Sequence, residues 1–256
     1  MTPRTAVVTG GAGGIGRATV ERLTRDGFAV VFADIDEARA REVAAETGAI
    51  AVIADVTTTE GVAVLVDAIE GEAVHALVNN VGHYLRPTPF AKSGAAHWDA
   101  LDAINLRHVF AVTHALLPRV IAARGAIVNV SSVEGLRGYP VDPVYGAYKA
   151  AVIHFTRCLA LELGGRGVRV NAIGPDITQT IQVDYSNIAE SDRERWQVWA
   201  PVGRMGEPAD QADVIAFLVS DDARFVTGHC IPTDGGTLAG GGWFRIAGTG
   251  RWTNRP

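Results

Sequence analysis

A tyrosine and a lysine stand four residues apart in this chain, at Tyr145 and Lys149. In a helix this spacing puts both side chains on one face, about one turn apart. An ammonium about 4 Å from a phenolate, at an effective dielectric constant near 20, favours the phenolate by roughly 4 kcal/mol, or about three pKa units. The pair therefore predicts a tyrosine that works as a base near neutral pH. The alternative is an amphipathic helix whose Tyr145 and Lys149 simply face solvent.

A serine that could share this site precedes the pair. Ser132 lies thirteen positions before Tyr145, where the apolar run 126–130 ends. In a doubly wound sheet the ligand crevice lies outside the carboxyl ends of the strands. We therefore expect Ser132 to face the same cavity as Gly14 and Asn80.

A glycine-rich segment fills residues 9–16, between the first apolar run and the first segment of helical period. Missing side chains let a backbone approach a pyrophosphate, whose charge then meets the amides and the positive dipole end of the following helix. Two glycine patterns fit, one read at Gly11, Gly13 and Gly16, the other at Gly10, Gly14 and Gly16. A plain tight turn is the alternative, and the order strand, glycine loop, helix, strand and acid argues against it.

The acid of this pattern, Asp34, bears on which dinucleotide would bind. A carboxylate here accepts hydrogen bonds from the adenosine ribose and repels a 2′-phosphate. Neither Gly13, before Gly14, nor Ile35, after Asp34, supplies a cation for such a phosphate. The sequence therefore predicts NAD and not NADP. The other interpretation of Asp34 is a helix cap, a role that Asp36 could equally fill.

These residues need a scaffold, and short Val- and Ile-rich runs that alternate with segments of helical period supply one. The expected strands are 5–9, 29–33, 49–54, 76–79, 126–130, 169–173 and 230–233. The expected helices are 15–25, 37–46, 58–69, 98–121, 143–163 and 208–219, with a capping box of Thr57 and Glu60. The pattern predicts an α/β fold: a doubly wound, seven-stranded parallel sheet with helices on both faces. It forms one domain, residues 1–242, followed by a C-terminal extension, residues 243–256.

Composition excludes several classes of protein. The 256 residues are 48% hydrophobic, carry a net charge of −5 and include two cysteines. This balance excludes a disordered chain and a disulfide framework, and it gives no basic footprint for nucleic acid or anionic lipid. With no signal peptide or membrane-length apolar stretch, we expect a cytoplasmic protein whose partners are small molecules and copies of itself.

The motifs in combination resemble the short-chain dehydrogenase/reductase family, NAD(P)-dependent oxidoreductases with a Rossmann fold. The resemblance covers about residues 4–240. It rests on Thr9-Gly-x-x-x-Gly14-x-Gly16, Asp55, Asn79-Asn80-Val81-Gly82, Asn105, Ser132, Tyr145-x-x-x-Lys149 and Asn171-x-x-x-Pro175.

The resemblance implies a catalytic tetrad that interconverts a secondary alcohol and a ketone. Tyr145 would exchange the proton, and Ser132 would hydrogen-bond the same oxygen. Lys149 would lower the pKa of the tyrosine and hold the nicotinamide ribose, and Asn105 would anchor a water that relays the proton. Hydride passes directly between substrate and cofactor.

The resemblance also implies NAD-binding positions and a homotetramer built on segments 98–121 and 143–163. Asp55 would contact the adenine, Asn80 and Gly82 the adenosine side, and Thr180 the carboxamide region. The full set is Gly10, Gly13, Gly14, Ile15, Gly16, Asp34, Ile35, Asp55, Val56, Asn80, Gly82, Tyr145, Lys149, Pro175 and Thr180.

The chain departs from the family pattern in four places. Val81 replaces an alanine, and Tyr148 replaces a serine, which would alter the pocket or a subunit contact. Asp176 replaces the glycine after the family proline, and we expect its carboxylate to tune substrate charge preference. The extension 243–256 is either a loose tail or a strap over a neighbouring subunit.

The sequence does not identify one substrate. A lid is expected at residues 181–201, and the candidate wall residues are His83, Glu134, Tyr139, Asp176, Tyr185 and Trp196, for which ordinary packing is the alternative. They suggest a bulky secondary alcohol. A dehydrogenase of cyclic dihydrodiols and a non-catalytic NAD sensor are the other functions considered. No G-x-S-x-G elbow suggests a serine hydrolase, and no His or Cys spacing suggests a metal.

Overall fold

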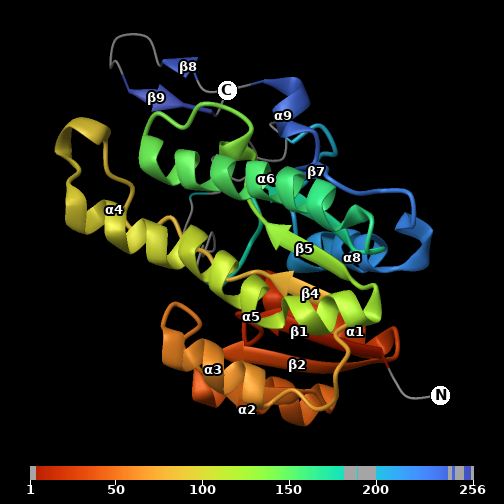
Figure 1. Ribbon diagram of the computed structural model, residues 1–256. Helices are drawn as coiled ribbons and strands as arrows, with labels where there is room; N and C mark the ends of the chain where they lie inside the picture. Colours follow the sequence, from red (N-terminus) through yellow and green to blue (C-terminus); the bar gives the residue numbers. More distant parts are fainter. Residues whose placement is uncertain (1–3, 182–188, 190–199, 242–243, 246–250, 255–256) are drawn as a thin grey trace.

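The computed structural model describes residues 4–181, 189, 200–241, 244–245 and 251–254. Its centre is a seven-stranded, all-parallel sheet of strand order β3-β2-β1-β4-β5-β6-β7 (Figure 1), which confirms the predicted fold class. The strands are β1 (Arg4–Thr9), β2 (Phe28–Asp34), β3 (Ile50–Ile53), β4 (Ala76–Asn79), β5 (Ala126–Val130), β6 (Arg169–Pro175) and β7 (Cys230–Thr233). The strand order reverses between β1 and β4, and this switch point is where such sheets bind ligands.

Helices cover both faces of this sheet, and α5 and α6 lie in front of it in Figure 1. They are α1 (Gly14–Arg25), α2 (Glu37–Thr47), α3 (Thr59–Asp67), α4 (Ala95–Asp102), α5 (His108–Ala123), α6 (Pro143–Gly164), α8 (Pro208–Val219) and α9 (Thr237–Gly240). Within the described residues, none of the helices combines the length and apolar character that a membrane span requires.

Two separate apolar clusters hold the layers together, because successive residues of a strand point to opposite faces. Val8 and Phe32 pack with α1 and α8 on one face. Val7 and Leu77 pack with α3, α5 and α6 on the other. Both faces of the strands are therefore buried, which explains why their sequence is continuously apolar and not alternating.

Two local predictions were wrong. Thr58, and not Thr57, caps α3: its hydroxyl accepts the Gly61 N–H, while Thr57 bonds back to Asp55. The expected single helix 98–121 is interrupted at Ala103–Arg107, where the backbone forms a π-helical turn. Such turns are found mostly inside longer helices and frequently at functional sites.

The C-terminal extension returns to the body of the protein. Strands β8 (Phe244–Arg245) and β9 (Trp252–Thr253) pair antiparallel, at the top of Figure 1. Asn254, directly after β9, lines the same cavity as Tyr145. The described part of the extension therefore contacts its own subunit, and a strap over a neighbouring subunit stays a prediction.

Candidate active site

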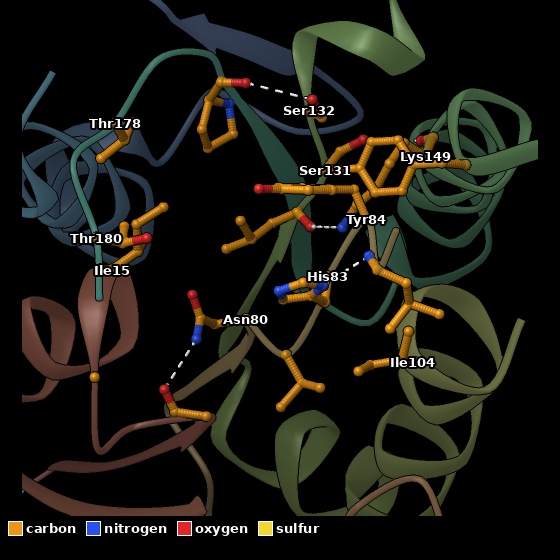
Figure 2. Close-up of a pocket in the computed structure, with 18 of the residues that line it drawn as sticks. Ile15, Asn80, His83, Tyr84, Ile104, Ser131, Ser132, Lys149, Thr178 and Thr180 are labelled. Carbon is orange, nitrogen blue, oxygen red and sulfur yellow. Dashed lines mark hydrogen bonds between the residues drawn. The ribbon is translucent and has the colours of Figure 1, made fainter. Parts of the chain in front are cut away.

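A cavity of about 970 Å³ lies along the carboxyl ends of the central strands. Its volume suits a dinucleotide with part of a substrate. Figure 2 shows Ile15, Thr178 and Thr180 on one side of it, with His83, Tyr84 and Lys149 on the other. All predicted cofactor residues line this cavity except Gly14 and Gly16, which lie in the first turn of α1.

The glycine loop fits a close approach by a phosphate. Gly14 begins α1 with φ +52°, in the left-handed region that favours glycine. A Cβ on Gly16 would lie 1.8 Å from the carbonyl oxygen of Gly10, so only glycine fits there. The positive φ of Gly10, +69°, and of Gly14 fits the second pattern, at Gly10, Gly14 and Gly16. Gly11 of the first pattern is also confined, because a Cβ there would lie 2.6 Å from the Phe32 ring, so the geometry does not choose between the two patterns.

Asn80 fixes this loop against β4. Its side-chain amide donates to the carbonyls of Thr9, at 2.9 Å, and Gly10, at 3.1 Å, and the second contact is drawn in Figure 2. The Thr9 hydroxyl in turn accepts the N–H groups of Asn80 and Val81, at 3.0 and 3.2 Å. These side chains therefore hold the glycine loop and the end of β4 in one arrangement.

Asp34 lies at the end of the cavity away from Tyr145. Its two carboxylate oxygens accept the N–H groups of Ala12, at 2.9 Å, and Asp36, at 3.0 Å. The cap of α2 is Asp36, whose side chain accepts from Arg39, so the helix-cap interpretation of Asp34 is wrong. Arg39 also lines the cavity here and was missed from the sequence, because only the position after Asp34 was considered.

Ser132, Tyr145 and Lys149 meet at the opposite end. The Ser132 hydroxyl accepts the Glu134 N–H at 3.1 Å and lies 3.5 Å from the Pro175 carbonyl oxygen, the contact drawn at the top of Figure 2. The Lys149 ammonium donates to the Val130 carbonyl at 3.2 Å and lies 5.8 Å from the centre of the Tyr145 ring. Three of the four residues of the predicted tetrad thus line one cavity.

The electrostatics differ from the sequence prediction. Burial raises the pKa of Tyr145, and this outweighs the hydrogen bond with Ser132, which lowers it. Burial also lowers the pKa of Lys149 to about 8. The prediction that Tyr145 titrates near neutrality is therefore wrong for the residues of the chain alone, because desolvation opposes both charged forms.

Asn105 lies in the π-helical turn, buried beside the cavity and not on its wall. Its amide donates to the carbonyls of His83, at 2.8 Å, and Leu101, at 3.1 Å, and its oxygen accepts the His83 N–H at 3.2 Å. A Cβ on Gly82 would lie 2.7 Å from the Lys149 nitrogen and 3.2 Å from the Asn105 oxygen. The glycine therefore leaves Lys149 and Asn105 room to approach each other.

Aromatic rings and carboxylates form the rest of this end. Tyr84 and Tyr139 pack edge-on against the Tyr145 ring, with centroids 6.5 and 5.7 Å away. Four of the predicted wall residues line the cavity, namely His83, Glu134, Tyr139 and Asp176. Tyr185 and Trp196 lie outside the described residues, as does most of the expected lid. Tyr148 does not line the cavity, so of its two predicted effects only a subunit contact remains.

Three residues were missed from the sequence: Tyr84 and Asn254, which line the cavity, and Arg137, which contacts two of its wall residues. Glu134 lies on the short helical turn Val133–Gly135, and Arg137, three residues later, pairs with it at 2.9 Å. The spacing of three residues between an acid and an arginine could have predicted this ion pair. Nothing in the sequence marked Asn254, because the fold of the extension brings it to the cavity.

The fold and this cavity define a Rossmann-type dinucleotide-binding domain with a tyrosine–lysine pair at its reaction end. The profile of a family described as "Enoyl-(Acyl carrier protein) reductase" matches residues 10–237. The chain belongs to the short-chain dehydrogenase/reductase family and is an oxidoreductase.

Named relatives cover nearly the whole chain. A 3-oxoacyl-[acyl-carrier-protein] reductase of Thermotoga maritima is 35% identical over 92% of this chain and 98% of its own length. A cis-4-hydroxycyclohexanecarboxylate dehydrogenase of Sinomonas cyclohexanicum is 38% identical over 92% and 97%. The crystal structure of a 3-ketoacyl-(acyl-carrier-protein) reductase from Brucella melitensis, complexed with NADH, superposes with a TM-score of 0.82 at 31% identity, over 92% and 98% of the two chains.

Proposed function

We propose that the chain is an NAD-dependent oxidoreductase that interconverts a secondary alcohol and a ketone, with Tyr145 as the general acid and base. One observation carries the proposal: Ser132, Tyr145 and Lys149 line one end of a cavity whose other end is formed by the glycine loop and Asp34. Binding alone would not need a phenol, a hydroxyl and an ammonium around one point, which disfavours a non-catalytic NAD sensor.

The residues of the cavity fit the cofactor from end to end. The N–H groups at the start of α1 would hold the pyrophosphate, Asp34 the adenosine ribose and Lys149 the nicotinamide ribose. When bound, NAD supplies the carbon that accepts or returns a hydride. The chain itself orients the substrate oxygen between Ser132 and Tyr145 and moves its proton.

The raised pKa of Tyr145 favours one role at neutral pH. A protonated phenol donates to a carbonyl oxygen, so reduction of a ketone needs no prior ionisation. Oxidation of an alcohol needs the phenolate, so we expect its kcat/KM to increase as the pH rises above neutrality. The two directions should therefore have opposite pH profiles.

The choice of NAD over NADP rests on Asp34. Its carboxylate borders the adenosine end of the cavity and would meet a 2′-phosphate with like charge. Arg39, on the same wall, would favour NADP. The Brucella melitensis relative was solved with NADH, which supports the proposed preference.

A panel of neutral secondary alcohols and ketones, with NAD(H) and NADP(H), tests the proposal by absorbance of the reduced nicotinamide. We expect turnover with NAD(H), and loss of turnover with retained NADH binding in Tyr145→Phe. Binding of NADH without turnover of any panel member would instead favour the sensor.

We also propose self-association through α5 and α6, as the family resemblance implies. Phe110 of α5 packs edge-on against Phe155 of α6, with centroids 4.6 Å apart. Phe110 is 42% exposed and Leu161 of α6 is 86% exposed. Light scattering after size exclusion should give a tetramer, and Leu161→Arg should shift it toward smaller species while CD spectra stay unchanged.

A further inference from the structure

The reaction end of the cavity carries two carboxylates that the proposed chemistry does not use. Asp176 follows β6 directly, and Glu134 lies on the turn after β5. Arg137 bridges them, donating to Glu134 at 2.9 Å and to Asp176 at 3.1 Å. Arg137 is thus shared by two acids of the described part of the chain.

Asp176 is held by one oxygen only. Its Oδ2 accepts from Arg137 and also from the Thr237 hydroxyl, at 2.5 Å. Its Oδ1 accepts no hydrogen bond from the part of the chain that the structure describes, although the residue lines the cavity. A fixed carboxylate with one open oxygen is a hydrogen-bond acceptor in a set position.

The backbone next to Asp176 contacts Ser132, one of the reacting groups. The carbonyl of Pro175, the preceding residue, lies 3.5 Å from the Ser132 hydroxyl. Glu134, on the same wall, donates its N–H to that hydroxyl at 3.1 Å. A substrate held by Ser132 would therefore lie beside the backbone that carries Glu134 and Asp176.

The charges around this point disfavour an anion. Arg137 is engaged by two carboxylates, and Lys149 donates to the Val130 carbonyl. Burial raises the pKa of Asp176, and Arg137 opposes this by favouring the charged carboxylate. A carboxylate or sulfonate on the substrate would meet like charge here, whereas a hydroxyl would donate to Oδ1.

We propose that Asp176 is a specificity-determining residue, whose open oxygen selects substrates with a second hydroxyl near the reacting carbon and excludes anionic ones. The inference rests on the proposed function and narrows its substrate class to neutral diols and hydroxyketones. Arg137 and Thr237 are positioning residues, since they act by holding Asp176.

Three four-carbon alcohols test this with NAD: butane-2,3-diol, butan-2-ol, which lacks the second hydroxyl, and 3-hydroxybutyrate, which carries an anion. For the wild type we expect kcat/KM to fall in that order. Asp176→Asn should lower the ratio of diol to hydroxy acid at least tenfold, because the charge is lost while the size is kept. Asp67→Asn, an exposed site at the end of α3, is the control for net charge and should leave the ratio unchanged.

The outcomes are distinguishable. Turnover in which the wild type prefers 3-hydroxybutyrate to the diol overturns the inference without any variant. An unchanged ratio in a folded Asp176→Asn also overturns it, and Thr237→Val, which removes one anchor of the carboxylate, should move the ratio in the same direction as Asp176→Asn. No turnover of any neutral or anionic alcohol or ketone would overturn the proposed function itself.

Discussion

The ammonium of Lys149 lies 5.8 Å from the centre of the Tyr145 ring, one helical turn away on α6. It is held there by the Val130 carbonyl at the end of β5. The helix fixes the spacing of the two side chains, and the hydrogen bond to β5 fixes the position of the ammonium. Both residues therefore depend on the packing of α6 against β5, and not only on their separation in sequence.

Removing the phenol should remove the proton transfer and little else. Tyr145→Phe is expected to lower kcat/KM by about a thousandfold, within the usual range for loss of a general acid or base. Steady-state kinetics measure this, and NADH fluorescence titration should show retained binding. Tyr148→Phe, on the same helix but outside the cavity, is the matched control and should keep wild-type turnover. A turnover loss of less than tenfold in Tyr145→Phe would contradict its assigned role.

Burial of Lys149 should be visible in stability. Its pKa is about 8 in the folded chain, below the ordinary value of 10.5, so the unfolded chain binds more protons between these values. The unfolding free energy contributed by Lys149 therefore increases as the pH rises through this window, by up to about 1.4 kcal/mol per pH unit.

Urea unfolding of wild type and Lys149→Met at several pH values between 8 and 9.5 isolates this contribution as a difference. Effects of other groups, such as the half-buried Cys230 thiol, whose pKa is raised to about 11, cancel in that difference. The wild type should gain about 1 to 2 kcal/mol over the variant across the window. Lys92→Met, which removes the chain's other, exposed lysine, should show no such gain. A pH-independent difference for Lys149→Met would show that the ammonium is well solvated.

Much of the fold could be predicted because both faces of the strands are buried. The segments 76–79, 126–130 and 230–233 match β4, β5 and β7 residue for residue. The π-helical turn at Ala103–Arg107 could not be predicted, because its residues continue the apolar period of the flanking helices. Within this turn the Asn105 side-chain amide donates to the Leu101 carbonyl and also to the carbonyl of His83. The second contact depends on a segment that is distant in sequence.

In the candidate site, too, some features could be predicted from local sequence and others could not. Gly16 and Asp34 were predictable because their roles are local: a close backbone contact within one loop, and an acid at the end of one strand. The direction of the Tyr145 pKa was not, since desolvation depends on how the chain folds around the phenol, with the Tyr84 ring from a distant loop and the Tyr139 ring from the segment before α6.

Cofactor preference should depend on charge at the adenosine end. Asp34→Asn removes the repulsion of a 2′-phosphate and weakens the contact with the ribose, so the ratio of kcat/KM for NAD to that for NADP should fall about a hundredfold. Initial rates with both cofactors measure the ratio. Adding Arg39→Met should reverse the gain with NADP and leave the rate with NAD unaltered. If NADP is used as poorly by Asp34→Asn as by the wild type, Asp34 does not set the preference.

The start of the catalytic helix depends on Asp142, which is fully buried. One of its oxygens accepts the Tyr145 N–H at 3.2 Å, and the other accepts the Thr88 N–H at 3.2 Å and lies 2.9 Å from the His97 ring. The residue therefore caps α6 and ties it to the loop that leads into α4. Replacing it leaves two partly buried N–H groups without their acceptor.

Asp142→Ala is accordingly expected to lower the free energy of unfolding by roughly 3 kcal/mol, the loss of a cap together with a buried polar network. Asp36, the cap of α2, is partly exposed and, among the described residues, interacts with Arg39. Asp36→Ala should therefore lower the free energy of unfolding by about 1 kcal/mol. Urea unfolding at pH 7 compares the two. Because the Tyr145 backbone is one of the groups that Asp142 holds, kcat should also fall in Asp142→Ala. Equal destabilisation by the two substitutions would mean that Asp142 acts as an ordinary helix cap, without a part in holding the loop against the catalytic helix.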